Sequence, residues 1–195
     1  MTLRIAMLPG LALLTLVQTA SAGCREDIQV MMKAVEEATN YRIVTEITMS
    51  GSGVQHTEQH FLDYSHFYHR GEETGFHWLV LGDQEYMSSD GENWKPWQTR
   101  DAGWLEKDLA RNVELRDAVE NVACGTEEVD GVLYQKFQYV QKSEEPMQTV
   151  SEIVTYLDLH SGRPAMRIVN STSGGNQLET TSSFFWDEQV VLPTP

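Results

Sequence analysis

The chain has 195 residues, with 29 acidic against 14 basic side chains and a formal net charge of −15. This length fits a single domain, and so large a negative charge favours solubility and repels polyanions. These features exclude nucleic acid as a partner and argue against docking on anionic membrane surfaces.

The first 22 residues predict a secretory signal peptide. Arg4 gives a short basic start, residues 8–17 form an apolar core, and Ala20-Ser21-Ala22 supplies the small residues of a cleavage site. This run is short for a membrane span, and no later window approaches the ~20 apolar residues required. We therefore expect residues 23–195 to form one periplasmic or secreted domain without stable membrane insertion.

Two cysteines, Cys24 and Cys124, are present, and both fall in the exported part. In an oxidising compartment two such residues usually pair, so a disulfide is expected. The alternative is acylation of Cys24 after cleavage at Gly23, which would anchor the protein to a membrane. Ser21 stands where lipoprotein signals usually carry an aliphatic residue, so the disulfide is favoured.

The mature chain opens with a predicted amphipathic helix over residues 25–38. Its apolar residues recur at spacings of three and four, which places them on one face. Residues 41–50 then alternate between apolar and polar types, the pattern of a strand with two distinct faces. Two more strands are predicted at residues 54–62 and 65–70.

A tryptophan-rich meander follows, with predicted strands at residues 76–81, 84–88 and 93–95. Gly82-Asp83 and Asp90-Gly91 supply the turns, since Asp-Gly tolerates the positive φ that tight hairpins need. Pro96 is expected to end the meander. Trp78, Trp94 and Trp97 lie in or beside it. So large an aromatic surface needs apolar cover, either a helix or a ligand.

A second helical region is predicted over residues 102–119, in one or two pieces. Strands are then predicted at residues 121–129, 132–141, 149–159, 164–170 and 177–186. Hairpins dominate and no βαβ unit is evident, so the sheet should be antiparallel, and a long twisted sheet tends to curl. The predicted fold class is α+β: an unclosed β-barrel of about ten strands, covered on its concave face by an N-terminal helix and a mid-chain helical segment.

The order and turn chemistry of these elements resemble a known family. The segments that carry the resemblance are 82–86, 90–94, 129–132, 156–164 and Leu192-Pro193. They are similar to the periplasmic lipoprotein-carrier superfamily, which comprises LolA/LolB-like proteins and related lipid-binding proteins. The resemblance implies a hydrophobic cavity for acyl chains, a lipid or acylated protein as partner and an envelope protein as a further possible partner. It implies no enzymatic activity, catalytic residue or cofactor.

Apolar residues at alternating positions of the strands, with neighbours on the helices, are the candidates for the cavity wall. The alternative is that they pack together as a filled core, which would leave a structural or protein-interaction module of the same fold. The candidates are Met31, Met32, Ile43, Ile47, Phe76, Trp78, Val80, Tyr86, Trp94, Trp104, Phe184 and Trp186.

Five of the six histidines fall between positions 56 and 77. On a strand, His56, Glu58 and His60 would share a face, a spacing that could bring two imidazoles and a carboxylate to one metal ion. Exposed polar positions on edge strands give the same pattern, so metal binding is less favoured than a carrier or an interaction module. No G-x-S-x-G motif or glycine-rich phosphate loop is present, and no enzyme is predicted.

Overall fold

The computed structural model describes residues 17–49, 53–144 and 148–195, with side chains from residue 23 onward. Within these residues the chain forms two helices and eleven strands. Their bounds are α1 Val17–Glu36, β1 Tyr41–Met49, β2 Gly53–Asp63, β3 His66–Gly71, β4 His77–Leu81, β5 Gln84–Ser88, β6 Lys95–Thr99, α2 Trp104–Asp117, β7 Glu120–Val129, β8 Val132–Ser143, β9 Thr149–Asp158, β10 Pro164–Ser173 and β11 Asn176–Phe185.

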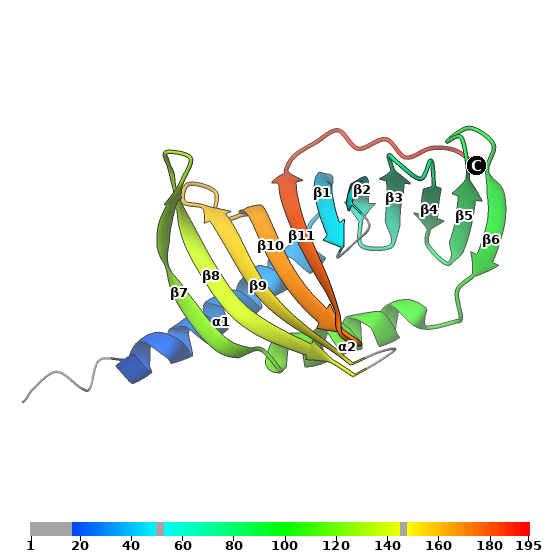
Figure 1. Ribbon diagram of the computed structural model, residues 1–195. Helices are drawn as coiled ribbons and strands as arrows, with labels where there is room; N and C mark the ends of the chain where they lie inside the picture. Colours follow the sequence, from blue (N-terminus) through cyan, green and yellow to red (C-terminus); the bar gives the residue numbers. More distant parts are fainter. Residues whose placement is uncertain (1–16, 50–52, 145–147) are drawn as a thin grey trace, which may run out of the picture.

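All eleven strands belong to one antiparallel sheet with the order β6-β5-β4-β3-β2-β1-β11-β10-β9-β8-β7. Strands β1 to β6 form a meander that runs out to one edge (Figure 1). Helix α2 carries the chain across to the other edge, and β7 to β11 return to the centre. There β11 pairs with β1 over eight residue pairs, so the first and last strands join the two halves.

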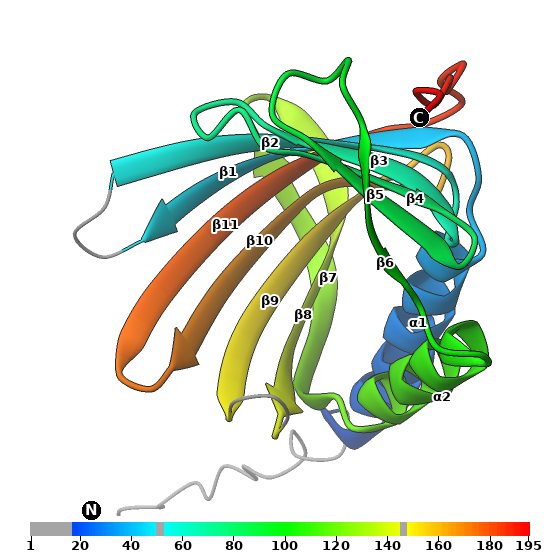
Figure 2. The ribbon, with the colours of Figure 1, turned by 90° about the vertical axis from the view of Figure 1, so that its right-hand side faces the viewer.

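The sheet is curled and unclosed, and both helices lie inside the curve (Figure 2). Helix α1 packs against β7, and α2 contacts both α1 and β8. This architecture confirms the predicted α+β class, with eleven strands in place of about ten. No helix in the described part of the chain combines the length and the apolar character needed to cross a bilayer.

The main core lies between α1 and the strands of the C-terminal half. Ile28 of α1 is fully buried there and packs with residues of β8 and β9 such as Phe137, Tyr139 and Ile153. The Cys24–Cys124 disulfide confirms the predicted pairing and fixes α1 to β7. It closes a loop of 100 residues, for which the chain-entropy account gives about 4.7 kcal/mol of stabilisation before any native strain is subtracted.

Three predicted elements need correction. The first helix starts at Val17 rather than residue 25, so its first turns precede the predicted signal-peptide cleavage site. The third strand of the meander is Lys95–Thr99, not residues 93–95. Pro96 lies inside this strand rather than ending it, because β6 is an edge strand and a missing N–H can face solvent there. The mid-chain helical region is one continuous helix, Trp104–Asp117.

Strand register decides which side chains face the helices. Tyr41 of β1 lies opposite Phe61 of β2, Phe61 opposite Phe67 of β3, and Phe67 opposite Val80 of β4. Because side chains directly opposite one another share a face, these four residues form one row across the concave side. Tyr41 and Phe61 stack with ring centroids 4.6 Å apart, which makes the row continuous.

Candidate functional site: a cavity under the second helix

A cavity of ≈ 460 Å³ lies between the helices and the concave face of the sheet. A smaller one of ≈ 290 Å³ continues from it toward β4, and both are lined by Phe61 and Tyr64, so they adjoin. The larger cavity is lined by Met32, Val35, Glu36, Tyr41, Phe61, Tyr64, Asn112, Leu115, Arg116, Tyr139, Gln141, Ser151, Ile153, Arg167 and Val169. The smaller is lined by Gln59, Phe61, Tyr64, Phe67, Trp78, Arg100, Trp104 and Asp108.

The floor of the larger cavity comes from alternate residues of three neighbouring strands. Tyr139 of β8 lies opposite Ile153 of β9, and Ile153 lies opposite Val169 of β10. Tyr139 and Ile153 are buried, and Val169 packs against them. These strands therefore supply a continuous apolar floor, which is the usual character of a small-molecule pocket.

Helix α2 forms part of the roof and is held there by polar contacts. It has no buried residue. The Tyr64 hydroxyl donates to Asp108 Oδ2 at 2.6 Å and accepts from Asn112 Nδ2 at 2.9 Å. Burial, followed by the hydrogen bond to Asp108, raises the pKa of Tyr64 to about 12, so this hydroxyl keeps its proton. The other end of α2 is tied to α1 by the Arg116–Glu36 ion pair at 2.8 Å.

The smaller cavity ends at a buried ion pair. Glu85 of β5 is only 4 % exposed, and its carboxylate accepts from Arg100 and, at 3.0 Å, from the indole N–H of Trp78. The Arg100 guanidinium lies 3.9 Å from the ring centroid of Trp104, the first residue of α2. These contacts position both indoles at this end of the cavity and satisfy the buried carboxylate.

One cationic side chain of the larger cavity has no counter-ion. Arg167 of β10 makes no ion pair within the described residues, and its Nε is buried without a hydrogen-bond partner. Its guanidinium carbon lies 5.3 Å from the ring centroid of Phe184. The remaining charged residues of this lining, Glu36 and Arg116, form an ion pair with each other. The cavity therefore carries an excess of one positive charge.

Most of the predicted ligand-binding residues lie on the side of the helices, at different distances from the cavity. Met32, Trp78 and Trp104 line the two chambers. Met31 and Trp186 line a separate hollow of ≈ 390 Å³ beside α1. The other candidates on this face line neither chamber. Ile43 and Phe184 lie opposite each other in the β1–β11 pairing, and Ile47 lies further along β1. Val80 is fully buried, and the ring of Phe76 packs against His69.

Two candidates lie on the opposite face of the sheet. Tyr86 is opposite Leu79 in the β4–β5 pairing and alternates with the inward-facing Glu85. Trp94 packs edge-on against Tyr68 and lies near His77. The sheet separates both aromatic rings from the cavity. Their role is to cover the convex side of β3 to β5, where Leu79 is fully buried.

Several residues that line the cavities were not predicted from the sequence. Phe61 and Phe67 belong to strands whose polar and apolar residues do not alternate cleanly. Tyr139 could have been found from the alternation of Phe137, Gln138 and Tyr139, whereas the residues around Ile153 do not alternate. Arg167 could not have been found, because apolar residues surround it on both sides and leave its face undetermined.

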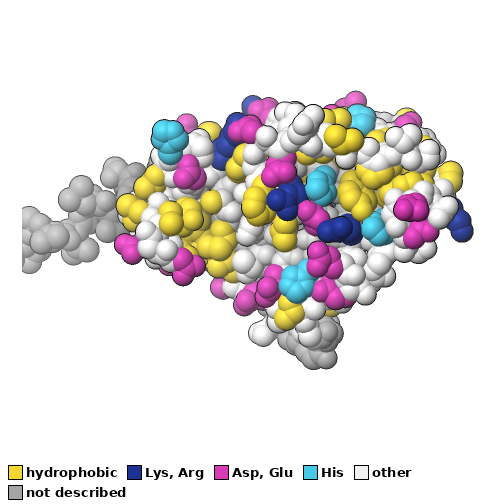
Figure 3. All heavy atoms as spheres, turned by 90° about the horizontal axis from the view of Figure 1, so that it is seen from above, with side chains coloured by type: hydrophobic (Ala, Val, Ile, Leu, Met, Phe, Trp, Pro, Cys, Tyr) yellow, Lys and Arg dark blue, Asp and Glu magenta, His cyan; other side chains and the backbone are white. Residues whose placement is uncertain are grey.

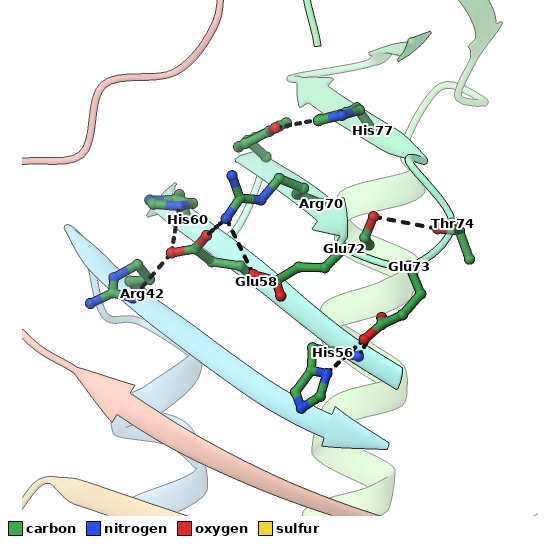
Figure 4. Close-up of polar contacts among 11 residues, drawn as sticks. Arg42, His56, Glu58, His60, Arg70, Glu72, Glu73, Thr74 and His77 are labelled. Atoms are coloured by element: carbon green, nitrogen blue, oxygen red, sulfur yellow. Dashed lines mark hydrogen bonds and ion pairs between the residues drawn. The ribbon is translucent and has the colours of Figure 1, made fainter. Parts of the chain in front are cut away.

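The predicted metal-binding set, His56, Glu58 and His60, lies on the convex face, where two arginines bind the Glu58 carboxylate (Figure 4). Glu58 accepts from Arg42 at 3.0 Å and from Arg70 at 2.6 Å, with His60 at 3.3 Å. His56 bonds Glu73 instead, a contact that raises the pKa of His56. Among the described residues no group of three His, Cys, Asp or Glu side chains is placed to hold a metal ion.

The view from above in Figure 3 shows how charge is distributed on one face of the molecule. Lys and Arg side chains there are interspersed with Asp and Glu, and the visible face has no continuous basic patch.

The structure is similar to two solved structures of low sequence identity. One is an outer membrane lipoprotein-sorting protein domain from Vibrio parahaemolyticus, 11% identical, with a TM-score of 0.38, covering 88% of this chain and 95% of that one. The other is a LolA superfamily protein from Nitrosomonas europaea, 8% identical, with a TM-score of 0.34, covering 89% and 95%. The likeness is to the group that the sequence resembles.

No protein-family model matches the sequence, and the search of curated proteins gives no match. Because both TM-scores lie below 0.5, the likeness carries no functional weight. The proposals below rest on the geometry of this chain alone.

Proposed function

We propose that this protein is a non-enzymatic binding or carrier protein for an acyl chain or similar elongated apolar group, held in the concave cavity. The observation that carries the proposal is the pair of adjoining chambers between sheet and helices, of ≈ 460 and ≈ 290 Å³. Ligand pockets commonly have volumes of about 300–1,000 Å³ and mostly apolar walls. These volumes favour a ligand pocket over a filled core, the alternative left open by the sequence.

The driving force would be burial of apolar surface, at about 25 cal/mol per Å² before the costs of association are subtracted. The aromatic walls suit this role because they are rigid and lose little entropy when a chain packs on them. Helix α2 suits it as a cover that is held by polar contacts, since such a cover can be displaced without exposing a large apolar core. The disulfide is consistent with an exported protein that meets its ligand outside the cytoplasm.

The direct test is to purify the protein from cells, extract it with organic solvent and identify any co-purified lipid by mass spectrometry. A second measurement uses the protein after delipidation and titrates it with a fluorescent fatty-acid probe that brightens in apolar surroundings. The proposal expects either a bound acyl lipid in the first measurement or saturable probe binding in the second. Absence of both overturns it.

Neighbouring residues of β10 provide a matched pair of variants. Val169 lines the cavity, whereas Ile168 is next to it on the strand and faces the convex side. The variant Val169→Trp fills the larger chamber, and we expect it to weaken probe binding by at least about tenfold, a loss of about 1.4 kcal/mol. Ile168→Trp adds the same bulk outside the cavity and should bind as the unmodified protein does. Equal binding by both variants would place the ligand elsewhere.

A further inference from the structure

Arg167 projects into a cavity whose other walls are mainly apolar. It lies in the middle of β10, opposite Thr155 of β9 and Ser182 of β11, both uncharged. Two residues further along the strand, on the same face, is Val169 of the apolar floor. The guanidinium therefore lies among hydroxyl-bearing and aromatic neighbours, beside the surface that would receive an apolar chain.

An unpaired charge in such a place is costly. Buried charges in proteins are normally paired and hydrogen-bonded, because removal from water without a partner is strongly unfavourable. Arg167 as a whole is half-buried, but its Nε is buried and has no acceptor in the described part of the chain. The hydroxyl of Thr155, 0 % exposed and opposite Arg167, also lacks a partner. A missing anionic group would explain both the position of the charge and the absence of its counter-ion.

A second donor lines the same cavity as Arg167. The Tyr41 side chain lines the same cavity, and no hydrogen bond to its hydroxyl is found among the described residues. Burial raises the pKa of Tyr41 to about 12, while the positive charge of Arg167 acts in the opposite direction. The hydroxyl is thus protonated at neutral pH and can donate to an acceptor that Arg167 also contacts.

We propose that Arg167 and Tyr41 bind the oxyanion head group of an amphiphile whose apolar chain occupies the cavity. This inference rests on the proposed function and narrows its ligand class to an acyl or alkyl chain that ends in a carboxylate or phosphate. A guanidinium suits either group, because its planar set of N–H donors matches two oxygens of one anion. The chain would extend from Arg167 over Val169 and Ile153, the apolar floor of the larger chamber.

The net charge of the protein does not oppose this assignment. The chain carries a formal charge of −15, but salt screens exposed charges beyond about 8 Å at physiological ionic strength. The head group would be buried beside Arg167, where the local charge of the cavity lining is positive. The contact with Arg167 would therefore decide between an anionic and a neutral ligand of equal chain length.

The test compares three ligands with the same 18-carbon chain: oleic acid, methyl oleate and oleyl phosphate. Each displaces a fluorescent fatty-acid probe from the delipidated protein. Oleic acid or oleyl phosphate should bind about 10- to 100-fold more tightly than methyl oleate, as expected for a hydrogen-bonded ionic contact. Whichever anion binds more tightly identifies the head group as carboxylate or phosphate.

The decisive variant is Arg167→Met, which keeps an unbranched side chain of similar length and removes the charge. It should bind methyl oleate as the unmodified protein does and lose the preference for the anions. Arg167→Lys keeps the charge without the planar donor set and should retain part of the preference. The matched control is Arg70→Met on the convex face, where Glu58 would keep Arg42 as a partner. It should retain the full preference.

The outcomes separate this inference from the proposed function. If all three ligands bind equally well to the unmodified protein, the apolar site stands and the assignment of Arg167 is overturned. If Arg167→Met keeps the anion preference, it is also overturned. If no ligand binds, both proposals fall. Should Arg167→Met fail to fold, as judged by circular dichroism, Tyr41→Phe is the second variant, expected to lower anion binding several-fold while leaving methyl oleate unchanged.

Discussion

His69 is a histidine that the fold holds on the concave face. It pairs across the strands with Gln59 and Trp78, and its ring packs edge-on against Phe76. Its Nδ1 is buried and has no hydrogen-bond partner within the described residues. Burial is the cause of a lowered pKa for His69. The neutral imidazole is therefore the form that the folded protein accommodates.

Because His69 is buried in its neutral form, we expect the folded protein to lose stability at acid pH. Below the ordinary histidine pKa of about 6.5 the unfolded chain takes up a proton that folded His69 resists, so protonation favours unfolding. The free energy of unfolding should fall as pH drops from 7 to 5, and His69→Gln should make that slope shallower, by at most about 1.4 kcal/mol per pH unit. Urea unfolding at several pH values measures it. The exposed His160 in the turn after β9 gives the control variant His160→Gln, which should keep the original slope.

Site residues could be predicted from sequence only where the local pattern determines the face of the strand. In β1 the alternation of Ile43 and Ile47 with mostly polar neighbours identified inward positions, and the structure places both on the side of the helices. Arg167 gives no such signal, because Met166 and Ile168 are apolar as well. Its role depends on what lies opposite it in β9 and β11, and that information is not local.

At the scale of elements, α2 differs from α1 in how it is attached. Ile28 and Met31 anchor α1 in the core, whereas α2 has no buried residue. Its attachment depends on side-chain hydrogen bonds, with Tyr64 as the partner of Asp108 and Asn112. This difference explains why the apolar side of residues 102–119 is less distinct in the sequence than that of the first helix.

The variant Tyr64→Phe tests this attachment. It removes both hydrogen bonds and leaves the ring in place, so we expect about 1 kcal/mol or less of lost global stability, together with faster amide exchange across residues 104–117. Hydrogen–deuterium exchange read by mass spectrometry measures the local effect. Tyr68→Phe is the control, because Tyr68 bonds His77 on the convex face. If exchange in α2 is unchanged in Tyr64→Phe, other contacts hold the helix.

For the whole molecule, the central feature is the pairing of β1 with β11. Local signals such as Asp130-Gly131, both with positive φ, predicted the hairpins of each half. They could not predict that the first strand joins the last, because that contact spans nearly the whole described chain. We call this pairing of β1 with β11 the seam. A side-chain hydrogen bond supports it, with the Thr45 and Ser182 hydroxyl oxygens 2.9 Å apart. The curl that creates the cavity depends on this seam, since it lies between the two meanders.

A proline placed in β11 tests whether the molecule folds as one unit across the seam. Thr181 lies opposite Glu46 of β1 and Ile168 of β10, so its N–H lies between two neighbouring strands whichever way it points. Thr181→Pro should cost at least about 3 kcal/mol, because a ladder hydrogen bond is lost and a buried partner is left unpaired. Circular dichroism during urea unfolding measures the loss.

The control for this variant lies in edge strand β6. Trp97 is 60 % exposed and falls at the register shift between the pairs Tyr86–Pro96 and Glu85–Gln98. Trp97→Pro should cost less than about 1 kcal/mol, since an edge or bulge position tolerates a missing donor. If the two halves fold independently, Thr181→Pro will give two transitions, with the signals of residues 53–99 unaffected. A single transition shifted to lower urea shows that the seam couples both halves, and with them the cavity between sheet and helices.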